Sequence, residues 1–298
     1  MQTREIIILR LLEKSGGSTS RLNLMKWAFL LSRNRSIDPK AVYQFFPYKY
    51  GPYSLTLMHE LGKMAQDGLV LEPDPKSIAL AAGATPAALL DEETESHLAK
   101  VWSLYGEMTT KQLLDTVYRE FPWYTCLSER KRFADKPIAE PMIYTAGYEG
   151  LELDGFLNLL LASGIREIID VRRNPIARKY GFHRRTVENA ARNVGIGYSH
   201  IPQLGIPSDR RTDLTGFASY ERLFTWYEEE VLGSNHELVA QLAVRTQSSP
   251  SVLICQERDP LYCHRTRLAK YLAIQNGLER IDLRSLKWTS ALKERGYS

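Results

Sequence analysis

Short apolar runs alternate with amphipathic stretches from residue 142 to residue 273. Strands are expected at residues 142–145, 165–171, 197–202 and 252–255, of which all but the third are mainly apolar. The amphipathic stretches, which suit helices, are residues 154–162, 186–193, 220–231, 236–246 and 266–273. Strands that alternate with helices favour crossover connections and a mainly parallel sheet. Residues 141–298 are therefore predicted to form an α/β, Rossmann-like domain.

Residues 1–136 show mostly helical periodicity instead. Helices are expected at residues 6–12, 20–30 and 55–65. Thr19 or Ser20 can cap the second of these, and a brief apolar strand at residues 69–71 follows the third. Residues 73–86, which are rich in Pro, Ala and Gly, suit a loop or a wing. This order predicts a mostly α, winged-helix-like domain that ends in a charged stretch before Pro137.

The composition is that of a globular protein with enough apolar residues for two cores. Of the 298 residues, 44% are hydrophobic and 25% are charged, with a net charge of +4. The three cysteines form no paired disulfide framework, which fits a reducing compartment. No apolar run approaches the ~20 residues of a membrane helix, and the N-terminus lacks signal-peptide features. We therefore expect a cytoplasmic protein with no membrane contact, and neither a membrane protein nor a disulfide-stabilised secreted domain.

The turn after the last apolar run contains an unusual concentration of reactive groups. Its thiols, carboxylates, imidazole and guanidiniums belong to Cys255, Glu257, Arg258, Asp259, Cys263, His264 and Arg265. A helix is expected to begin where the turn ends, so its unpaired backbone N–H groups face the turn. Open α/β sheets bind ligands at the carboxyl ends of their strands, and the functional site is predicted here.

Two carboxylates are the predicted catalytic pair. Glu257 follows the end of one predicted strand and Asp170 ends another, so a parallel sheet brings both to one edge. Such surroundings displace the pKa of a carboxyl group, and hydrolysis of an N-glycosidic bond needs a carboxylate. The alternative is that Asp170 only forms an ion pair with Arg172 or Arg265 and fixes the loops.

Other residues of this edge are predicted to bind the substrate. They are Tyr148, Arg172, Arg173, Gln203, Cys255, Cys263, His264 and Arg265. Arg173, Arg265 and the helix start at His264 would bind a phosphate or another anion. Tyr148 would stack on a base, although packing in the core explains a tyrosine equally well.

A basic run at residues 172–185 follows one predicted strand and contains no acidic residue. Its side chains, with one from the first domain, are the predicted nucleic-acid contacts: Lys49, Arg178, Lys179, Arg184 and Arg185. Clustered positive charge of this kind binds phosphates. A solvated face without a partner is the alternative.

Cys255 and Cys263 allow several interpretations. They lie eight positions apart and no second cysteine pair follows, which argues against a closed structural zinc site. An open site with His264 stays as an alternative, but no metal and no cofactor are expected. A nucleophilic thiolate suits a helix N-terminus, yet Arg265 is too far from Cys255 for the loop of rhodaneses and cysteine phosphatases. The favoured role of Cys255 is a small, buried strand-end residue.

Four stretches between residues 141 and 275 resemble the domain-of-unknown-function family 488. They are residues 144–148, 169–172, 198–205 and 255–265, and the last is the most specific. The first turn reads Gly-Tyr-Glu where many relatives have Gly-His-Ser, so no catalytic role is carried over to it. The resemblance implies a Rossmann-like domain and no particular reaction.

Residues 49–54 and 105–125 are similar to the Panacea or SocA-like family of winged-helix proteins, and the likeness extends over about residues 1–135. It implies a module that contacts DNA or another protein.

Together these patterns favour a nucleic-acid-directed enzyme, with DNA as the partner, that acts in repair or in defence against foreign DNA. Removal of a base by N-glycosidic cleavage is the first choice of reaction and phosphodiester cleavage the second. One rival is a non-catalytic regulator that binds DNA or a protein and has a nucleotide- or anion-binding pocket. The other is a rhodanese-like thiol enzyme.

Overall fold

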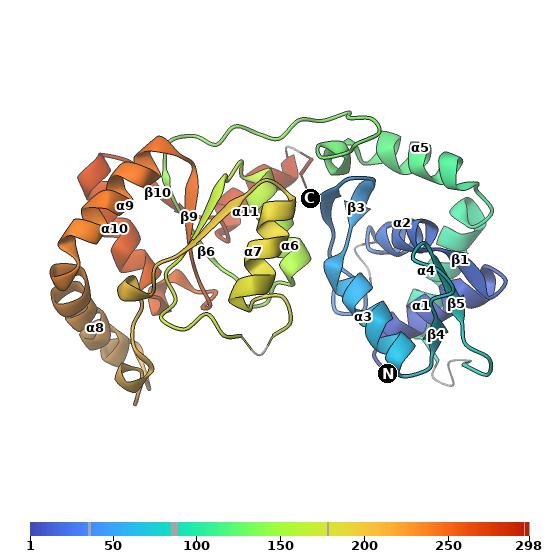
Figure 1. Ribbon diagram of the computed structural model, residues 1–298, viewed down its shortest axis with the longest axis horizontal. Helices are drawn as coiled ribbons and strands as arrows, with labels where there is room; N and C mark the ends of the chain where they lie inside the picture. Colours follow the sequence, from blue (N-terminus) through green and yellow to red (C-terminus); the bar gives the residue numbers. More distant parts are fainter. Residues whose placement is uncertain (35–36, 85–88, 178, 295, 298) are drawn as a thin grey trace. The chain divides into compact units, whose positions relative to one another are not determined.

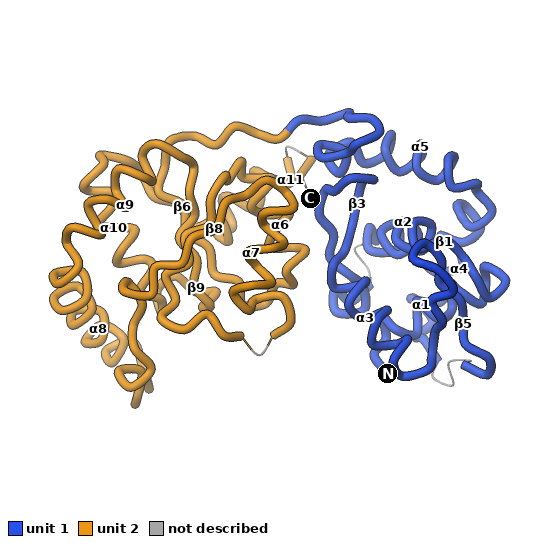
Figure 2. Tube along the Cα trace, viewed as in Figure 1, with its two compact units in different colours: residues 1–135 blue, residues 136–298 orange. Residues whose placement is uncertain are grey.

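The computed structural model divides the chain into two compact units, Met1–Asp135 and Lys136–Ser298 (Figure 2). It describes residues 1–34, 37–84, 89–177, 179–294 and 296–297. Among these residues, no helix is both long enough and apolar enough to cross a membrane.

The first unit is mostly helical. Its helices are α1 (Thr3–Lys14), α2 (Arg21–Leu31), α3 (Leu55–Gln66), α4 (Glu92–Tyr105), α5 (Thr110–Glu120) and the short η1 (Pro122–Thr125). Its strands are β1 (Ser18–Ser20), β2 (Phe46–Tyr48), β3 (Gly51–Tyr53), β4 (Val70–Leu71) and β5 (Ser77–Leu80). Ser20 caps α2 by accepting a hydrogen bond from the backbone N–H of Asn23 at 3.0 Å.

Two small antiparallel sheets complete the first unit. The strands β1, β5 and β4 pair in that order, and β5 lies inside the stretch predicted as a loop or wing. The strands β2 and β3 form a hairpin in which Gly51 has φ +83°, a conformation that favours glycine. Behind this hairpin the ammonium group of Lys26 is buried and donates to the carbonyl oxygen of Pro52 at 2.7 Å.

The second unit alternates strands and helices. Its strands are β6 (Ile143–Gly147), β7 (Glu167–Asp170), β8 (Gly197–His200), β9 (Ser251–Cys255) and β10 (Arg280–Asp282). Its α-helices are α6 (Leu153–Ala162), α7 (Arg184–Asn193), α8 (Phe217–Trp226), α9 (His236–Ser248), α10 (Arg265–Asn276) and α11 (Leu286–Glu294). Its shorter helical segments are η2 (Pro202–Leu204), η3 (Ser208–Arg210), η4 (Tyr227–Leu232) and η5 (Pro260–Tyr262).

The five strands of the second unit form one parallel sheet with the order β10-β6-β9-β7-β8. The helices α9 and α10 lie on one side of the sheet, and α6 and α7 lie on the other (Figure 1). Successive side chains of a strand point to opposite faces of the sheet. Ile169 and Leu253 pack in the core with α9 and α10, whereas Tyr144 contacts Trp288 of α11. The predicted α/β class with a parallel sheet is thus confirmed.

The sequence patterns did not predict the fifth strand, β10, or the last helix, α11. Strand β10 has only three residues, and two of them, Arg280 and Asp282, are charged. Such a segment carries neither the apolar run nor the length by which a buried strand is recognised. It nevertheless pairs with β6 and places Asp282 beside Thr145.

Candidate active site

The predicted site is built around the central strand of the sheet. Strand β9 has β6 on one side and β7 on the other, so the turn after Cys255 is flanked by the turns after Gly147 and after Asp170. The first of these turns touches it directly: a Cβ on Gly147 would lie 1.8 Å from the carbonyl oxygen of Glu257. Only a glycine permits this approach.

Four side chains of this turn form what we call the donor cluster: Cys255, Glu257, Cys263 and His264. The thiols of Cys255 and Cys263 lie 3.0 and 3.1 Å from the same carboxylate oxygen, Oε2 of Glu257. Nδ1 of His264 lies 4.0 Å from Sγ of Cys255. Both cysteines and His264 are each only 1% exposed. Strand β9 ends at the first thiol and α10 begins beside the others, which is how the fold brings them together.

The contacts and the burial in the donor cluster shift the pKa values of three of its members. Hydrogen bonding by the Cys263 thiol, with help from His264, holds the pKa of Cys255 well below its usual value. Burial raises the pKa of Cys263, and burial followed by the neighbouring Cys255 raises the pKa of Glu257. These directions describe Cys255 as the more acidic thiol and Glu257 as a carboxylate that takes up a proton more readily than usual.

The orientation of His264 is fixed by the neighbouring strand. Nε2 of its ring lies 3.1 Å from the carbonyl oxygen of Val171. A carbonyl oxygen only accepts hydrogen bonds, so Nε2 must carry the hydrogen in this contact. Nδ1 is therefore the ring nitrogen that faces the donor cluster.

Two arginines hold Glu257 from opposite ends. Arg265 donates to its backbone oxygen at 2.6 Å and, from the same guanidinium, to Asp282 of β10 at 3.0 Å. Arg211, from the segment after η3, donates to Oε1 of its carboxylate at 3.1 Å. A cavity of 40 Å³ adjoins this carboxylate, and its lining includes Arg211, Tyr262 and His264.

A second group at this edge is what we call the arginine–tyrosine cluster: the buried Asp170, Arg172 and Tyr148 with the half-buried Tyr198. Arg172 donates to Asp170 through Nε at 2.9 Å and to the hydroxyl of Tyr148 at 3.0 Å. Tyr198 donates to the other carboxylate oxygen of Asp170 at 2.6 Å. Burial and the adjacent Asp170 raise the pKa of Tyr198, which keeps it a neutral donor.

The predicted catalytic pair is thus divided between the two clusters. Asp170 ends β7 and Glu257 follows the neighbouring β9, but the carboxylate of Asp170 is fully buried and accepts hydrogen bonds from Arg172 and Tyr198. Glu257 is the carboxylate beside the cavity. The ion pair between Asp170 and Arg172 is the arrangement that the sequence analysis kept as an alternative.

The predicted binding residues have different environments. The ring of Tyr148 stacks on Phe182 with centroids 4.1 Å apart, and the side chain of Arg265 is 0% exposed. Cys255, Cys263 and His264 belong to the donor cluster, and Arg172 to the arginine–tyrosine cluster. Arg173 and Gln203 are exposed, and Arg173 donates to the carbonyl oxygen of Pro202 at 3.3 Å.

The predicted nucleic-acid contacts are mostly at the surface. Lys179, Arg184 and Arg185 are exposed, and Arg184 lies 3.4 Å from Nδ1 of His200. Arg178 lies outside the described residues. Lys49 of the first unit forms an ion pair with Glu129 at 2.9 Å.

Sequence reasoning did not find Arg211 or Asp282. Arg211 is one charged residue among several in an irregular segment, and its partner Glu257 is 46 positions away. Asp282 lies on the short strand that was not predicted. No local pattern marks either residue, because each meets its partner only when segments distant in sequence come together in the fold.

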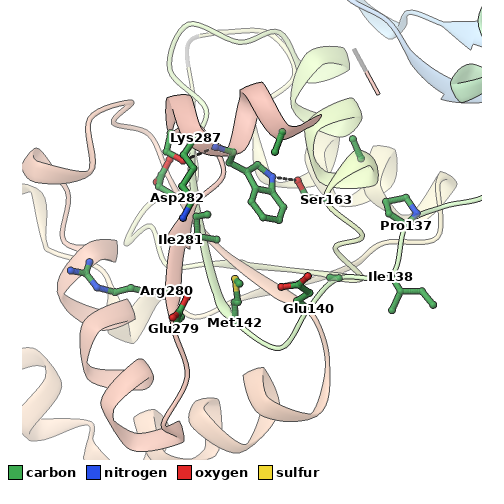
Figure 3. Close-up of a pocket in the computed structure, with 15 residues that line it drawn as sticks. Pro137, Ile138, Glu140, Met142, Ser163, Glu279, Arg280, Ile281, Asp282 and Lys287 are labelled. Carbon is green, nitrogen blue, oxygen red and sulfur yellow. Dashed lines mark hydrogen bonds between the residues drawn. The ribbon is translucent and has the colours of Figure 1, made fainter. Parts of the chain in front are cut away.

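A larger pocket lies elsewhere on the second unit. It has a volume of 510 Å³, and its lining includes Ile138, Ser163, Arg280 and Lys287 (Figure 3). Met142 and Glu279, which precede β6 and β10, also line it, so it lies toward the amino ends of these strands. Ligands of parallel sheets bind at the carboxyl ends, and the donor cluster is therefore the better candidate for chemistry.

Comparison with known proteins gives one match. Residues 152–272 match the sequence profile of the family described as "Domain of unknown function DUF488". The match covers β7, β8, β9 and both buried clusters apart from Tyr148. No curated protein and no solved structure was found to match the chain.

Proposed function

We propose that the second unit is a hydrolytic enzyme acting on DNA, with removal of a base by N-glycosidic cleavage as its reaction. The observation that carries the proposal is the placement of Glu257. Its carboxylate lies past the end of the central strand, beside a cavity, with one oxygen toward Arg211 and the other toward two thiols. A carboxylate in such a place suits proton transfer.

The proposed reaction depends on the raised pKa of Glu257. Its raised pKa brings the carboxyl group closer to neutral pH, where a general base and acid works best. Glu257 takes a proton from water, and the water oxygen bonds to the sugar carbon as the bond to the base breaks. The departing base keeps the electron pair of that bond and receives the proton. Water is thereby added across one C–N bond.

In this proposal Asp170 positions other groups. Both of its oxygens accept hydrogen bonds, and Arg172 also donates to the backbone oxygen of Phe182 at 2.9 Å. Arg172 thus fastens the start of the basic run to the sheet. The exposed Arg173, Lys179, Arg184 and Arg185 follow within this run, where they would contact phosphates.

The first unit would be the winged-helix-like module that contacts DNA. Its order α1, β1, α2, α3, β4, β5, with the sheet order β1-β5-β4, supports this assignment, because two strands joined by a loop after a third helix form a wing. The β2–β3 hairpin contains the Panacea-like turn at residues 49–54 and lies between α2 and α3 in the chain.

The test compares DNA binding with product formation in the full chain. Glu257→Gln should bind DNA as the wild type does and release base from base-modified duplexes about 10²–10⁴-fold more slowly. Glu188→Gln, on the surface of α7, is the matched control and should keep its rate. The triple variant Arg173→Gln, Arg184→Gln and Arg185→Gln should weaken binding and flatten its dependence on salt.

Three results would overturn the proposal. Absence of DNA binding at low salt would remove nucleic acid as the partner. Salt-dependent binding without any product would favour the non-catalytic regulator. A product rate that Glu257→Gln leaves unchanged, but that alkylation of Cys255 abolishes, would favour the thiol enzyme.

A further inference from the structure

We propose that Cys255, Cys263 and His264 bind one divalent ion of the zinc class, and that Glu257 stands beside its open coordination position. The binding site is argued from the side chains alone. The use of the ion in hydrolysis rests on the proposed function and deepens it.

The three ligand atoms are already gathered. Sγ of Cys255, Sγ of Cys263 and a ring nitrogen of His264 all lie within 4.8 Å of one another. Around tetrahedral zinc, with bonds of about 2.0–2.3 Å, such atoms are roughly 3.3–3.8 Å apart. The three atoms therefore have to approach one another by up to about 1.5 Å on binding. Two thiolates with one imidazole also match the ligand preference of zinc.

The hydrogen bond of His264 is the one expected of a ligand. A metal-bound histidine usually donates its other ring N–H to a carbonyl or a carboxylate, which fixes the tautomer. Nε2 of His264 meets the carbonyl oxygen of Val171 at 3.1 Å, so Nδ1 faces the thiols with its lone pair available in the neutral ring. The orientation needed for binding is thus set by Val171, the residue after β7.

Glu257 completes the arrangement without being needed as a ligand. Both sulfur atoms lie within 3.1 Å of its Oε2, so an ion bound by the two thiolates would lie beside this carboxylate. Arg211 holds Oε1 on the other side. The adjoining cavity of 40 Å³ exceeds the roughly 10–15 Å³ that one water requires.

Three protein ligands with one open position are typical of catalytic zinc. The zinc-dependent nucleobase deaminases likewise use His and Cys ligands with a glutamate that is not a ligand but transfers protons. If an ion were held by Cys255, Cys263 and His264, it would supply Lewis-acid activation of a water, and Glu257 would stand where it could accept a proton. The hydrolytic balance given above is unchanged, because the ion takes part without being consumed.

The site is tested on the reduced full chain with Co²⁺ as an optical probe. We expect a thiolate-to-cobalt absorption band that saturates at about one ion per chain and that Zn²⁺ abolishes. Cys255→Ser and Cys263→Ser should each lower the affinity at least about tenfold. Cys126→Ser is the matched control, since Cys126 is buried in the first unit, and it should bind as the wild type does. Circular dichroism checks that each variant is folded.

Glu257→Gln tests whether Glu257 is a fourth metal ligand or only lies beside an open coordination position. It should retain the cobalt band and its affinity, because the amide removes the base and no ligand. An equal loss of affinity in Glu257→Gln and Cys255→Ser would overturn the open position. Reduced wild-type protein without the band, or a band that survives in Cys255→Ser, would overturn the metal site itself.

The two proposals can fail separately. The titration contains no nucleic acid, so absence of the band refutes the metal site whatever the protein does to DNA. A saturable band in a protein that forms no product on DNA supports the metal site and refutes the proposed function.

Discussion

The two buried clusters at the edge of one sheet differ in how their polar groups are balanced. In the arginine–tyrosine cluster, one carboxylate meets one guanidinium, and Tyr198 donates to the same carboxylate. In the donor cluster, two thiols point at one oxygen of Glu257, and its cationic partner Arg211 contacts only the other oxygen. In the first cluster the charged and hydrogen-bonding groups satisfy one another. In the second, the electron-pair donors outnumber the cationic partners. Two buried clusters at one sheet edge can therefore differ in how fully their polar groups are paired.

The largest expected effect comes from breaking the complete cluster. Arg172→Met should lower the free energy of unfolding of the second unit by about 3–5 kcal/mol, because it leaves the fully buried Asp170 without its counter-ion. Hydrogen exchange of the β7 and β9 amides in the full chain measures this unit separately from the first. Arg173→Met, next in sequence but exposed, is the control. Equal losses in both variants would contradict the distinction between them.

Lys26 of the first unit is a third case of a buried polar group. Its hydrogen-bond partner is the carbonyl oxygen of Pro52. Burial lowers its pKa from 10.5 to about 7, so between these values the folded unit binds fewer protons than the unfolded chain. Stability should therefore rise with pH from about 7 to about 10, by up to about 1.4 kcal/mol per pH unit. Hydrogen exchange of α2 at several pH values measures this slope.

Lys26→Met should remove this slope, whereas Lys63→Met, on the exposed side of α3, should keep it. A slope that persists in Lys26→Met would assign the pH dependence to another group.

The smallest effect is expected at the donor cluster. Arg211→Met should change the free energy of unfolding by less than about 1 kcal/mol, because the side chains of Arg211 and Glu257 are 33% and 26% exposed and water screens their ion pair. Hydrogen exchange of the β9 amides, measured at increasing urea concentration, gives this change in the free energy of unfolding. A loss as large as that of Arg172→Met would make this cluster structural as well.

The sequence predicted those parts of the molecule whose signals are local. The alternation of strand and helix patterns identified four strands of the parallel sheet, and the turn at residues 255–265 already contains every member of the donor cluster. The partners of each residue were harder to predict from the sequence. Asp170 ends β7 and Glu257 follows the adjacent β9, and yet the two carboxylates contact different groups. Arg211 and Asp282 were missed because each meets its partner only after distant segments pair.

The order of the strands also decides when the site can form. Strands β6 and β7 do not pair with each other, because β9 lies between them. During synthesis of the chain from its N-terminus, both strands emerge well before β9, and the sheet stays open until residues 251–255 have left the ribosome. Contacts between segments so far apart in sequence also form slowly. The thiols of Cys255 and Cys263 therefore meet only after β9 has joined β6 and β7.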